Sequence, residues 1–315
     1  MKILVTGGSG LLGSALLNNL KEFDYQLIGT YHTSPPLLLS ENIKYIQVDL
    51  KDPQSCYDVT EGMNAVFLCA AQTGGIVETQ ESTKPVINTL RINAQMLDAC
   101  NLAQVQRVFL ISSTTIYPDS QSALVEQCGF TDDPCAPYFG IGWMNRYFEK
   151  LAQYYRDTFH LPVTIIRPTN MYGPRDNFSD KGAHVIPSLI KKFLLATHEV
   201  RIWGDGSQQR DFIFVEDVSD LLLKLLQQSF LPGPYNIGQG VGTSIRSLVN
   251  LLAELTDKTD INIEYDTTKL TGAPIRLVDT NLVKKEVGFT PKYSLSEGLK
   301  NTINWYQQIQ MGEMD

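Results

Sequence analysis

The sequence predicts an α/β protein with a doubly wound parallel sheet and a second, smaller α/β domain. An apolar run at residues 2–6 leads directly into a glycine-rich loop, and leucines at helical spacing follow the loop. Further short β-branched runs alternate with helical patterns as far as residue 167, whereas the later residues carry shorter signals and more turns. This order is typical of a Rossmann-type sheet, which binds ligands at the carboxyl ends of its strands.

The remaining strands of the sheet follow from their apolar content. We expect them at residues 26–30, 45–48, 65–69, 107–112 and 163–167, with helices after the glycine loop, after residue 53 and over residues 84–103. The composition shifts at residue 168. Shorter signals at 185–195, 200–203, 211–215, 217–228, 235–238, 247–256 and 295–308 predict the second domain. The expected division is 1–167, with 212–237 returning to it, against 168–211 and 238–315.

The glycine-rich loop is suited to hold a pyrophosphate. Gly7 permits a tight turn, Gly10 lets the backbone approach the phosphates, and Gly13 lets the next helix pack against the strand. Amide groups at the start of that helix are then aimed at the anion. We predict a dinucleotide site with contacts from Gly7, Ser9, Gly10, Leu11, Leu12 and Gly13. The alternative is a glycine turn in another kind of α/β protein.

Composition and charge exclude several classes of partner. The chain has 315 residues and a net charge of -8, with no long basic run, so nucleic acid is not expected as a ligand. No stretch approaches about 18 apolar residues, and the first apolar run ends at Gly7, so neither a membrane span nor a signal peptide is expected. The five cysteines show no C-x-x-C spacing. We expect reduced thiols, no metal site and a cytoplasmic protein.

The end of the second strand indicates which cofactor is bound. An acidic residue about 20 residues past the glycines would bond the adenosine ribose of NAD. The residues here are Thr30, Tyr31, His32 and Thr33, and none would repel a 2′-phosphate. NADP(H) is therefore favoured and NAD(H) remains possible. His32 can face the phosphate, or it can be a solvated loop residue.

Several motifs together carry a family likeness. They are the glycine loop, Asp49-Leu50, Ser-Ser-Thr-Thr-Ile-Tyr-Pro at 112–118, the stretch 168–174 and Trp-Gly-Asp-Gly-Ser-Gln-Gln-Arg-Asp-Phe at 203–212. The most specific part is 170–178 followed by His-Val-Ile-Pro at 184–187. The chain resembles the extended short-chain dehydrogenases/reductases that act on nucleotide sugars, and within them most resembles the GDP-L-fucose synthases.

The resemblance implies an activity and a set of binding residues. GDP-L-fucose synthases are NADPH-dependent and combine 3,5-epimerisation with 4-reduction of GDP-4-keto-6-deoxy-mannose, so a GDP-linked substrate is implied. Small residues after the fourth strand also let a flat ring lie near the backbone. Further cofactor contacts are expected from His32, Asp49, Leu50, Ala70, Ala71, Pro168, Asn170 and Met171. Substrate contacts are expected from Asn170, Asn177, Lys192, Trp203 and Arg210. A homodimer through the helices at 84–103 and 142–158 is implied as well.

The catalytic residues depart from the family pattern. The family uses a serine and a Tyr-x-x-x-Lys pair, in which the lysine lowers the tyrosine pKa. Ser113 matches the serine, but Ile141 and Asn145 occupy the tyrosine and lysine positions. Thr115 stands where the epimerising enzymes have a cysteine.

Other residues remain candidates for proton transfer. His184 matches the family's histidine, and Tyr138 lies three residues before the missing tyrosine. Tyr138 can enter the site or can be an aromatic that packs at a helix start. Arg146 can be a helix-surface charge or can replace the missing cation. The candidate catalytic residues are therefore Ser113, Thr115, Tyr138 and His184.

Two functions stay open. The first is an NAD(P)-dependent epimerase or reductase that acts on a GDP-linked hexose or ketohexose with atypical proton-transfer residues. The second is a catalytically silent protein that binds cofactor and nucleotide sugar and serves as a partner or regulatory subunit.

Overall fold

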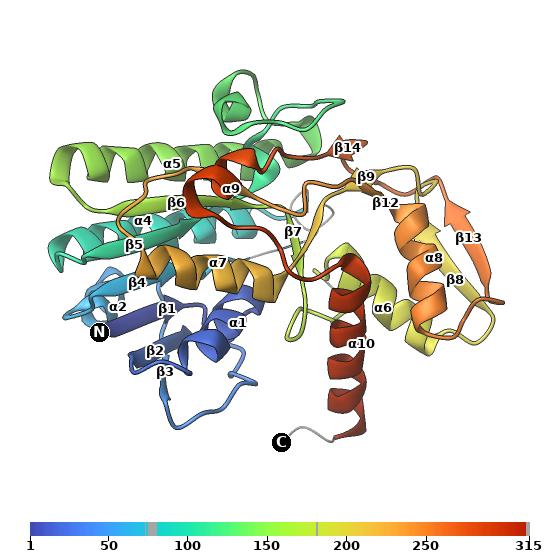
Figure 1. Cartoon of the computed structure of the whole chain (residues 1–315), viewed down its shortest axis with the longest axis horizontal. Helices are drawn as coiled ribbons and strands as arrows, with labels where there is room; N and C mark the ends of the chain where they lie inside the picture. The colour runs from blue at the N-terminus through green and yellow to red at the C-terminus, as the bar shows by residue number, and fades with distance from the viewer. Residues whose placement is uncertain (73, 75–80, 181, 313–315) are drawn as a thin grey trace.

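The large sheet of the protein contains seven strands, all paired in parallel. Figure 1 shows this sheet with helices on both sides of it. The computed structural model describes residues 1–72, 74, 81–180 and 182–312. The strand order is β11-β6-β5-β4-β1-β2-β3. The strands are β1 Lys2–Thr6, β2 Gln26–Tyr31, β3 Ile43–Gln47, β4 Ala65–Leu68, β5 Arg107–Ile111, β6 Val163–Pro168 and β11 Tyr235–Ile237. The predicted doubly wound α/β fold is confirmed.

Helices cover both faces of this sheet because side chains alternate along each strand. Ile3 and Val5 face a core cluster that includes α1 (Leu11–Leu20) and α7 (Val215–Gln227). Leu4 lies in the opposite cluster, with α2 (Pro53–Thr60), α4 (Lys84–Leu102) and α5 (Phe139–Phe159). The central strands β4 and β6 are thus buried on both sides, whereas the edge strand β3 is partly exposed.

A smaller body lies beside the carboxyl end of β6, to the right of the sheet in Figure 1. A further core cluster, separate from the two on the large sheet, lies in this body and contains side chains of α6 (Val185–Leu195), α8 (Ile245–Leu255) and α10 (Leu295–Met311). Short strands complete it: β7 Asn170–Tyr172 with β10 Phe212–Phe214, β8 Glu199–Trp203 with β13 Asn262–Asp266, and β9 Gln209–Arg210 between β12 Thr243–Ser244 and β14 Ile275–Arg276. The chain then returns to the large sheet at β11, and α9 (Asn281–Val287) packs there.

Some elements differ from expectation. Residues 170–172 form a strand inside the stretch interpreted as turn-rich, because they pair in parallel with 212–214. Residues 262–266 and 281–287 form a strand and a helix that the sequence patterns do not indicate. The long helix α5 begins at Phe139 and is preceded by the short helical turns η1 (Thr114–Ile116), η2 (Glu126–Phe130) and η3 (Ala136–Tyr138). Pairing partners distant in sequence explain the strands.

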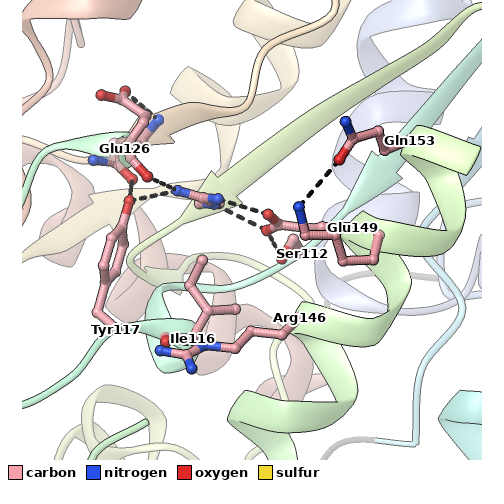
Figure 2. A network of polar contacts seen from close by, with 10 residues as sticks. Ser112, Ile116, Tyr117, Glu126, Arg146, Glu149 and Gln153 are labelled. Atoms are coloured by element: carbon pink, nitrogen blue, oxygen red, sulfur yellow. Dashed lines mark hydrogen bonds and ion pairs between the residues drawn. The ribbon is translucent and has the colours of Figure 1, made fainter. Parts of the chain in front are cut away.

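A buried polar network ties α5 to the ends of β5 and β6 (Figure 2). The Arg167 guanidinium donates to both carboxylate oxygens of Glu149 at 2.9 and 2.6 Å, and it also donates to the Tyr117 hydroxyl at 2.8 Å. The Ser112 hydroxyl donates to Glu149 at 2.5 Å. Arg167 and Glu149 are both almost fully buried. Because removal of one partner from a buried ion pair typically costs about 3–5 kcal/mol, this network fixes the position of α5.

The described part of the chain also bears on the expected partners. None of its helices combines the length and apolarity that a bilayer crossing requires. Within the same residues, no group of three or more His, Cys, Asp or Glu side chains is placed to hold a metal ion. All five cysteines are free thiols.

Candidate functional site

The glycine loop between β1 and α1 forms a turn that a side chain would block. Gly7 has φ +66°, and a Cβ there would lie 2.9 Å from the Cα of Ala70. A Cβ on Gly13 would lie 2.2 Å from the carbonyl oxygen of Gly7. The predicted roles of Gly7 and Gly13 therefore have a physical basis in close backbone approach.

The start of α1 fits a dinucleotide pyrophosphate. Gly10 is its N-cap residue, and among the described residues no side chain caps the helix, so Leu11, Leu12 and Gly13 supply its first amides. The loop is anchored from β2, where the Thr30 hydroxyl accepts from the Gly7 amide at 3.2 Å. Uncapped helix amides are suited to an anion. These residues and Ser9 would hold the phosphates.

The adenosine end of this site lies beyond β2 and β3. His32 Nε2 lies 3.7 Å from the Asp49 carboxylate, and Lys51 Nζ lies 3.1 Å from it. Partial burial alone would raise the pKa of Asp49, but hydrogen bonds from Lys51 and the charges of Lys51 and His32 lower it. Leu50 is buried behind this group. A histidine and a lysine thus flank the Asp49 carboxylate beyond the ends of β2 and β3, and residues 30–33 themselves carry no acidic side chain.

Several of the predicted cofactor residues follow or end strands β4 and β6. Ala70 and Ala71 follow β4, and the Ala70 amide donates to the Thr6 hydroxyl at 3.0 Å. Pro168 ends β6, and Met171 lies in β7. These positions surround the carboxyl ends of β4 and β6, where a ligand of this fold class binds.

The residues at the family's serine and cysteine positions lie together after β5. Ser113 accepts from the Thr115 amide at 3.2 Å and caps η1. The Asn145 side-chain amide donates to the Thr115 hydroxyl at 3.1 Å. Asn145 is only 5% exposed, and Ile141 packs partly against the core on the α4 and α5 side. Neither can move a proton, since isoleucine has none to give and the amide carries no charge.

Tyr138 lines a cleft together with Arg276, and a second arginine, Arg210, lies close to its phenol. The Arg276 guanidinium lies 4.4 Å from the centre of the Tyr138 ring, and the same cleft is lined by Thr115 and Cys135. Burial by itself would raise the pKa of Tyr138, but the charges of Arg276 and Arg210 and a hydrogen bond from Arg276 outweigh it. The pKa of this phenol therefore lies below its ordinary value of 10.0.

Tyr138, Arg210 and Arg276 come from distant segments of the chain. Arg210 is in β9 and Arg276 in β14, and the two residues are partners in the parallel pairing of those strands. Tyr138 ends η3, directly before α5. Arg276 is a functional candidate that the sequence reasoning missed, and its two-residue strand gives no periodic signal that could have found it.

Arg146 is not a surface charge, so that interpretation is wrong. The residue is 3% exposed, its Nε donates to the Ile116 carbonyl at 2.9 Å, and a terminal nitrogen donates to the Asp132 carbonyl. Its guanidinium also lies over the Trp143 ring. Arg146 therefore anchors η1 and the loop around Asp132 to α5. Its guanidinium is taken up by these hydrogen bonds to backbone carbonyls.

His184 is the N-cap residue of α6. Its Nδ1 lies 4.0 Å from the carboxylate of Asp176, whose side chain is only 4% exposed. The histidine side chain itself is 47% exposed. Burial raises the pKa of Asp176 to about 6, with His184 and the Asn177 amide opposing this rise. The sequence reasoning identified His184 but not Asp176.

The remaining predicted substrate residues are spread over the smaller body. The Asn170 side chain donates to the Asp211 carbonyl at 2.8 Å. Lys192 Nζ donates to the Arg201 carbonyl at 2.8 Å, and burial lowers the pKa of Lys192. Trp203 is exposed at the end of β8. The Asn177 carboxamide oxygen accepts from Ser179. Among these predicted residues, Arg210 hydrogen-bonds the Tyr138 side chain, and its guanidinium also donates to the Gln209 and Thr271 carbonyls.

Comparison with known proteins assigns the chain. The model of the NAD dependent epimerase/dehydratase family matches residues 3–238. The chain belongs to this family. It is 29% identical over 314 residues to a putative GDP-L-fucose synthase 2 of Arabidopsis thaliana, which covers 97% of this chain and 91% of that protein.

Two further relatives widen the picture. GDP-mannose 3,5-epimerase of Arabidopsis thaliana is 26% identical over 317 residues, covering 98% of this chain and 82% of that protein. The crystal structure of a UDP-glucose 4-epimerase from Thermotoga maritima with UDP-glucose superposes with a TM-score of 0.89 at 26% identity, covering 98% of this chain and 100% of that one. The predicted resemblance to extended nucleotide-sugar reductases and epimerases is confirmed, and this is a family of enzymes that use a nicotinamide cofactor.

Proposed function

We propose that the chain is an NADP(H)-dependent epimerase or reductase that acts on a GDP-linked hexose or ketohexose, with proton transfer by Tyr138 and His184. The observation that carries this proposal is the position of the Tyr138 phenol beside Arg276 and Arg210. In the family, a lysine one helical turn from the tyrosine lowers the phenol pKa. Here two arginines from another part of the chain supply the positive charge.

Tyr138 would hold or release the proton at the sugar oxygen. A phenol whose pKa is drawn toward the working pH is a more efficient acid and base, which is the tuning that general catalysis requires. Ser113 and Thr115 would hydrogen-bond the same part of the sugar. Bound nicotinamide cofactor would supply the hydride chemistry.

Arg276 and Arg210 would also bind the diphosphate of the nucleotide. Guanidinium groups bond phosphate oxygens bidentately, and Arg210 is the residue that the sequence motif assigns to this task. Trp203, Lys192, Asn170 and Asn177 would complete the nucleotide and sugar contacts, with the exposed Trp203 ring available for stacking.

His184 would act on the opposite side of the sugar from Tyr138. It comes from the start of α6, whereas Tyr138 precedes α5, so the two groups come from different elements. One residue of the family's epimerising pair is thereby kept, and Thr115 cannot form a thiolate. This favours reduction, or epimerisation at one centre, over the double epimerisation of the GDP-L-fucose synthases.

The cofactor preference and the division into domains belong to the same proposal. NADP(H) is favoured because residues 30–33 carry no acidic side chain and because His32 and Lys51 lie at the end of β2 and β3. The segment 168–211 with 238–315 would bind the nucleotide sugar, and 1–167 with the returning 212–237 the dinucleotide. The free thiols fit a reducing, cytoplasmic setting.

A homodimer is proposed through α4 and α5. Four aromatic side chains of α5 recur at helical spacing and are exposed: Phe139, Trp143, Tyr147 and Tyr154. Exposed aromatic stripes of this kind are typical of protein interfaces, which Tyr and Trp enrich. The exposed Ile87 of α4 would extend the surface.

The test is turnover of a defined substrate. Purified protein with NADPH and GDP-4-keto-6-deoxy-mannose should oxidise NADPH, and mass spectrometry should find the reduced sugar nucleotide. A mass spectrum of small molecules that co-purify with the protein would name the cofactor and base independently. Tight binding of both ligands without any turnover or solvent deuterium exchange would instead favour the catalytically silent partner.

A further inference from the structure

We propose that Asp176 is a positioning residue that orients the His184 imidazole, with the Nδ1–H toward the carboxylate and Nε2 left to exchange a proton with substrate. This inference rests on the role of His184 in the proposed function and goes beyond it, because it assigns the tautomer and names the group that selects it. The two residues are joined through the loop between β7 and α6.

The backbone turns Asp176 inward by an unusual conformation. Gly173 has φ +157° and Arg175 has φ +67°, a left-handed value that few side chains adopt. The turn closes with the Asp176 amide donating to the Gly173 carbonyl at 3.3 Å. Arg175 is held in this conformation by its Nε, which donates to the Ser14 hydroxyl of α1 at 3.1 Å. The position of Asp176 is therefore set by contacts outside its own loop.

The hydrogen bonds of the Asp176 carboxylate do not suit a purely structural role. Its Oδ1 accepts from the Asn177 amide at 2.7 Å, whereas its Oδ2 is buried and has no hydrogen-bond partner among the described residues. Desolvation of an unpaired carboxylate oxygen is costly, so a structural role alone would be better served by a neutral side chain. A carboxylate oxygen can accept two hydrogen bonds. Oδ1 has only the Asn177 amide as a hydrogen-bond donor among the described residues and lies nearest the His184 imidazole, so it can take a second donor from that ring.

His184 is placed to be that donor. Its Nδ1 lies 4.0 Å from Oδ1 of the carboxylate, which is within ion-pair range and longer than a hydrogen bond. Catalytic hydrogen bonds are often long before ligands bind. The hydrogen bond on one ring nitrogen decides which tautomer is present, so an acceptor at Nδ1 places the proton there. Nε2 then keeps its lone pair on a side chain that remains half exposed.

The test reads the tautomer directly and requires no substrate. The chain has four histidines, so the ring nitrogens of each can be followed in long-range ¹H–¹⁵N spectra of the full-length, ligand-free protein. His184 is assigned from the signals absent in His184→Gln. Above its titration, wild-type His184 should carry its proton on Nδ1, and Asp176→Asn should lose that preference. The matched control is Asp180→Asn, which removes an exposed carboxylate of the same loop, paired with Lys191 at 2.6 Å, and should leave the tautomer unchanged.

Folding does not confuse this experiment, because Asp176→Asn is isosteric and removes a desolvated charge, and the other three histidines report the native state. A wild-type His184 with its proton on Nε2, or the same tautomer in wild type and Asp176→Asn, overturns the inference. Given turnover, Asp176→Asn should lower kcat at least about tenfold with KM little changed, since a histidine held in the wrong tautomer loses far more in hydrolases of the Ser-His-Asp kind. If no sugar nucleotide reacts but the tautomer responds as expected, the proposed function fails and the orientation by Asp176 stands.

Discussion

Replacement of Tyr138 by phenylalanine isolates the proposed acid. The change removes one oxygen and leaves a ring that still lies against the Arg276 guanidinium, so the nucleotide contacts proposed for Arg276 and Arg210 should be kept. General acid catalysis contributes about 10²–10⁴-fold, and a lost phenol should lower kcat by a factor in this range with KM nearly unchanged. The assay is NADPH oxidation with the GDP-linked ketohexose. The same substitution at the exposed Tyr147 is the control and should retain full activity.

The pH profile of this reaction carries a second, independent signature. In reduction the phenol acts in its protonated form, so the rate should fall as pH rises through the lowered pKa of Tyr138. Arg276→Met removes the largest source of positive charge on the phenol and should move this fall to higher pH, while KM rises because a phosphate contact is lost. Reduction by Tyr138→Phe within about threefold of wild type would refute the assignment, since that loss is smaller than any general acid supplies.

Four further outcomes follow from the structure. The double change Ile141→Tyr with Asn145→Lys should raise ketosugar reduction measured by NADPH oxidation, whereas either single change should do little, because the tyrosine needs the cation; equal rates in all three variants would count against the alignment. Calorimetry should find NADP(H) bound about tenfold more tightly than NAD(H), a difference of about 1.4 kcal/mol, and His32→Ala should narrow the gap. Trp143→Glu should halve the mass seen by light scattering, and an unchanged mass would remove the α5 interface. Burial raises the pKa of Asp211 to about 6, so between about pH 4 and 6 the native state holds a proton that the unfolded state has lost. The free energy of unfolding should therefore fall by about 3 kcal/mol as the pH rises through that window, and denaturant titrations of Asp211→Asn should lack this part of the pH dependence.

The large sheet could be predicted because each of its strands carries its own signal. Runs such as residues 65–68 are apolar on both faces, which is the mark of a parallel strand covered by helices. The glycine loop could be predicted equally well. The structure leaves no room for a Cβ at Gly7 or Gly13, so these positions require glycine and the sequence shows it. These are local properties, and local properties are what a sequence displays.

The cleft around Tyr138 could be predicted only in part. Tyr138 and Arg210 stand in recognisable motifs, but Arg276 reaches them by the pairing of two-residue strands that lie 66 residues apart in sequence. Asp176 lies in a polar loop, and its burial depends on the left-handed turn at Arg175 and on a contact with α1. The interpretation of Arg146 failed for the same reason, because the carbonyls that it binds belong to η1 and to the loop around Asp132.

The arginines that attend Tyr138 make that side chain an optical reporter of its own ligand. The pKa is raised in seven other tyrosines, namely Tyr45, Tyr57, Tyr117, Tyr155, Tyr172, Tyr235 and Tyr293. The pKa of Tyr138 is lowered instead, so Tyr138 ionises before these seven as the pH rises. In the proposed complex, a diphosphate that neutralises Arg210 and Arg276 would return the proton to the phenol. Protons and nucleotide would therefore bind with mutual reinforcement, and by reciprocity the nucleotide affinity would weaken as the phenol ionises. Loss of tyrosinate absorbance on addition of a nucleoside diphosphate would record the event without any label.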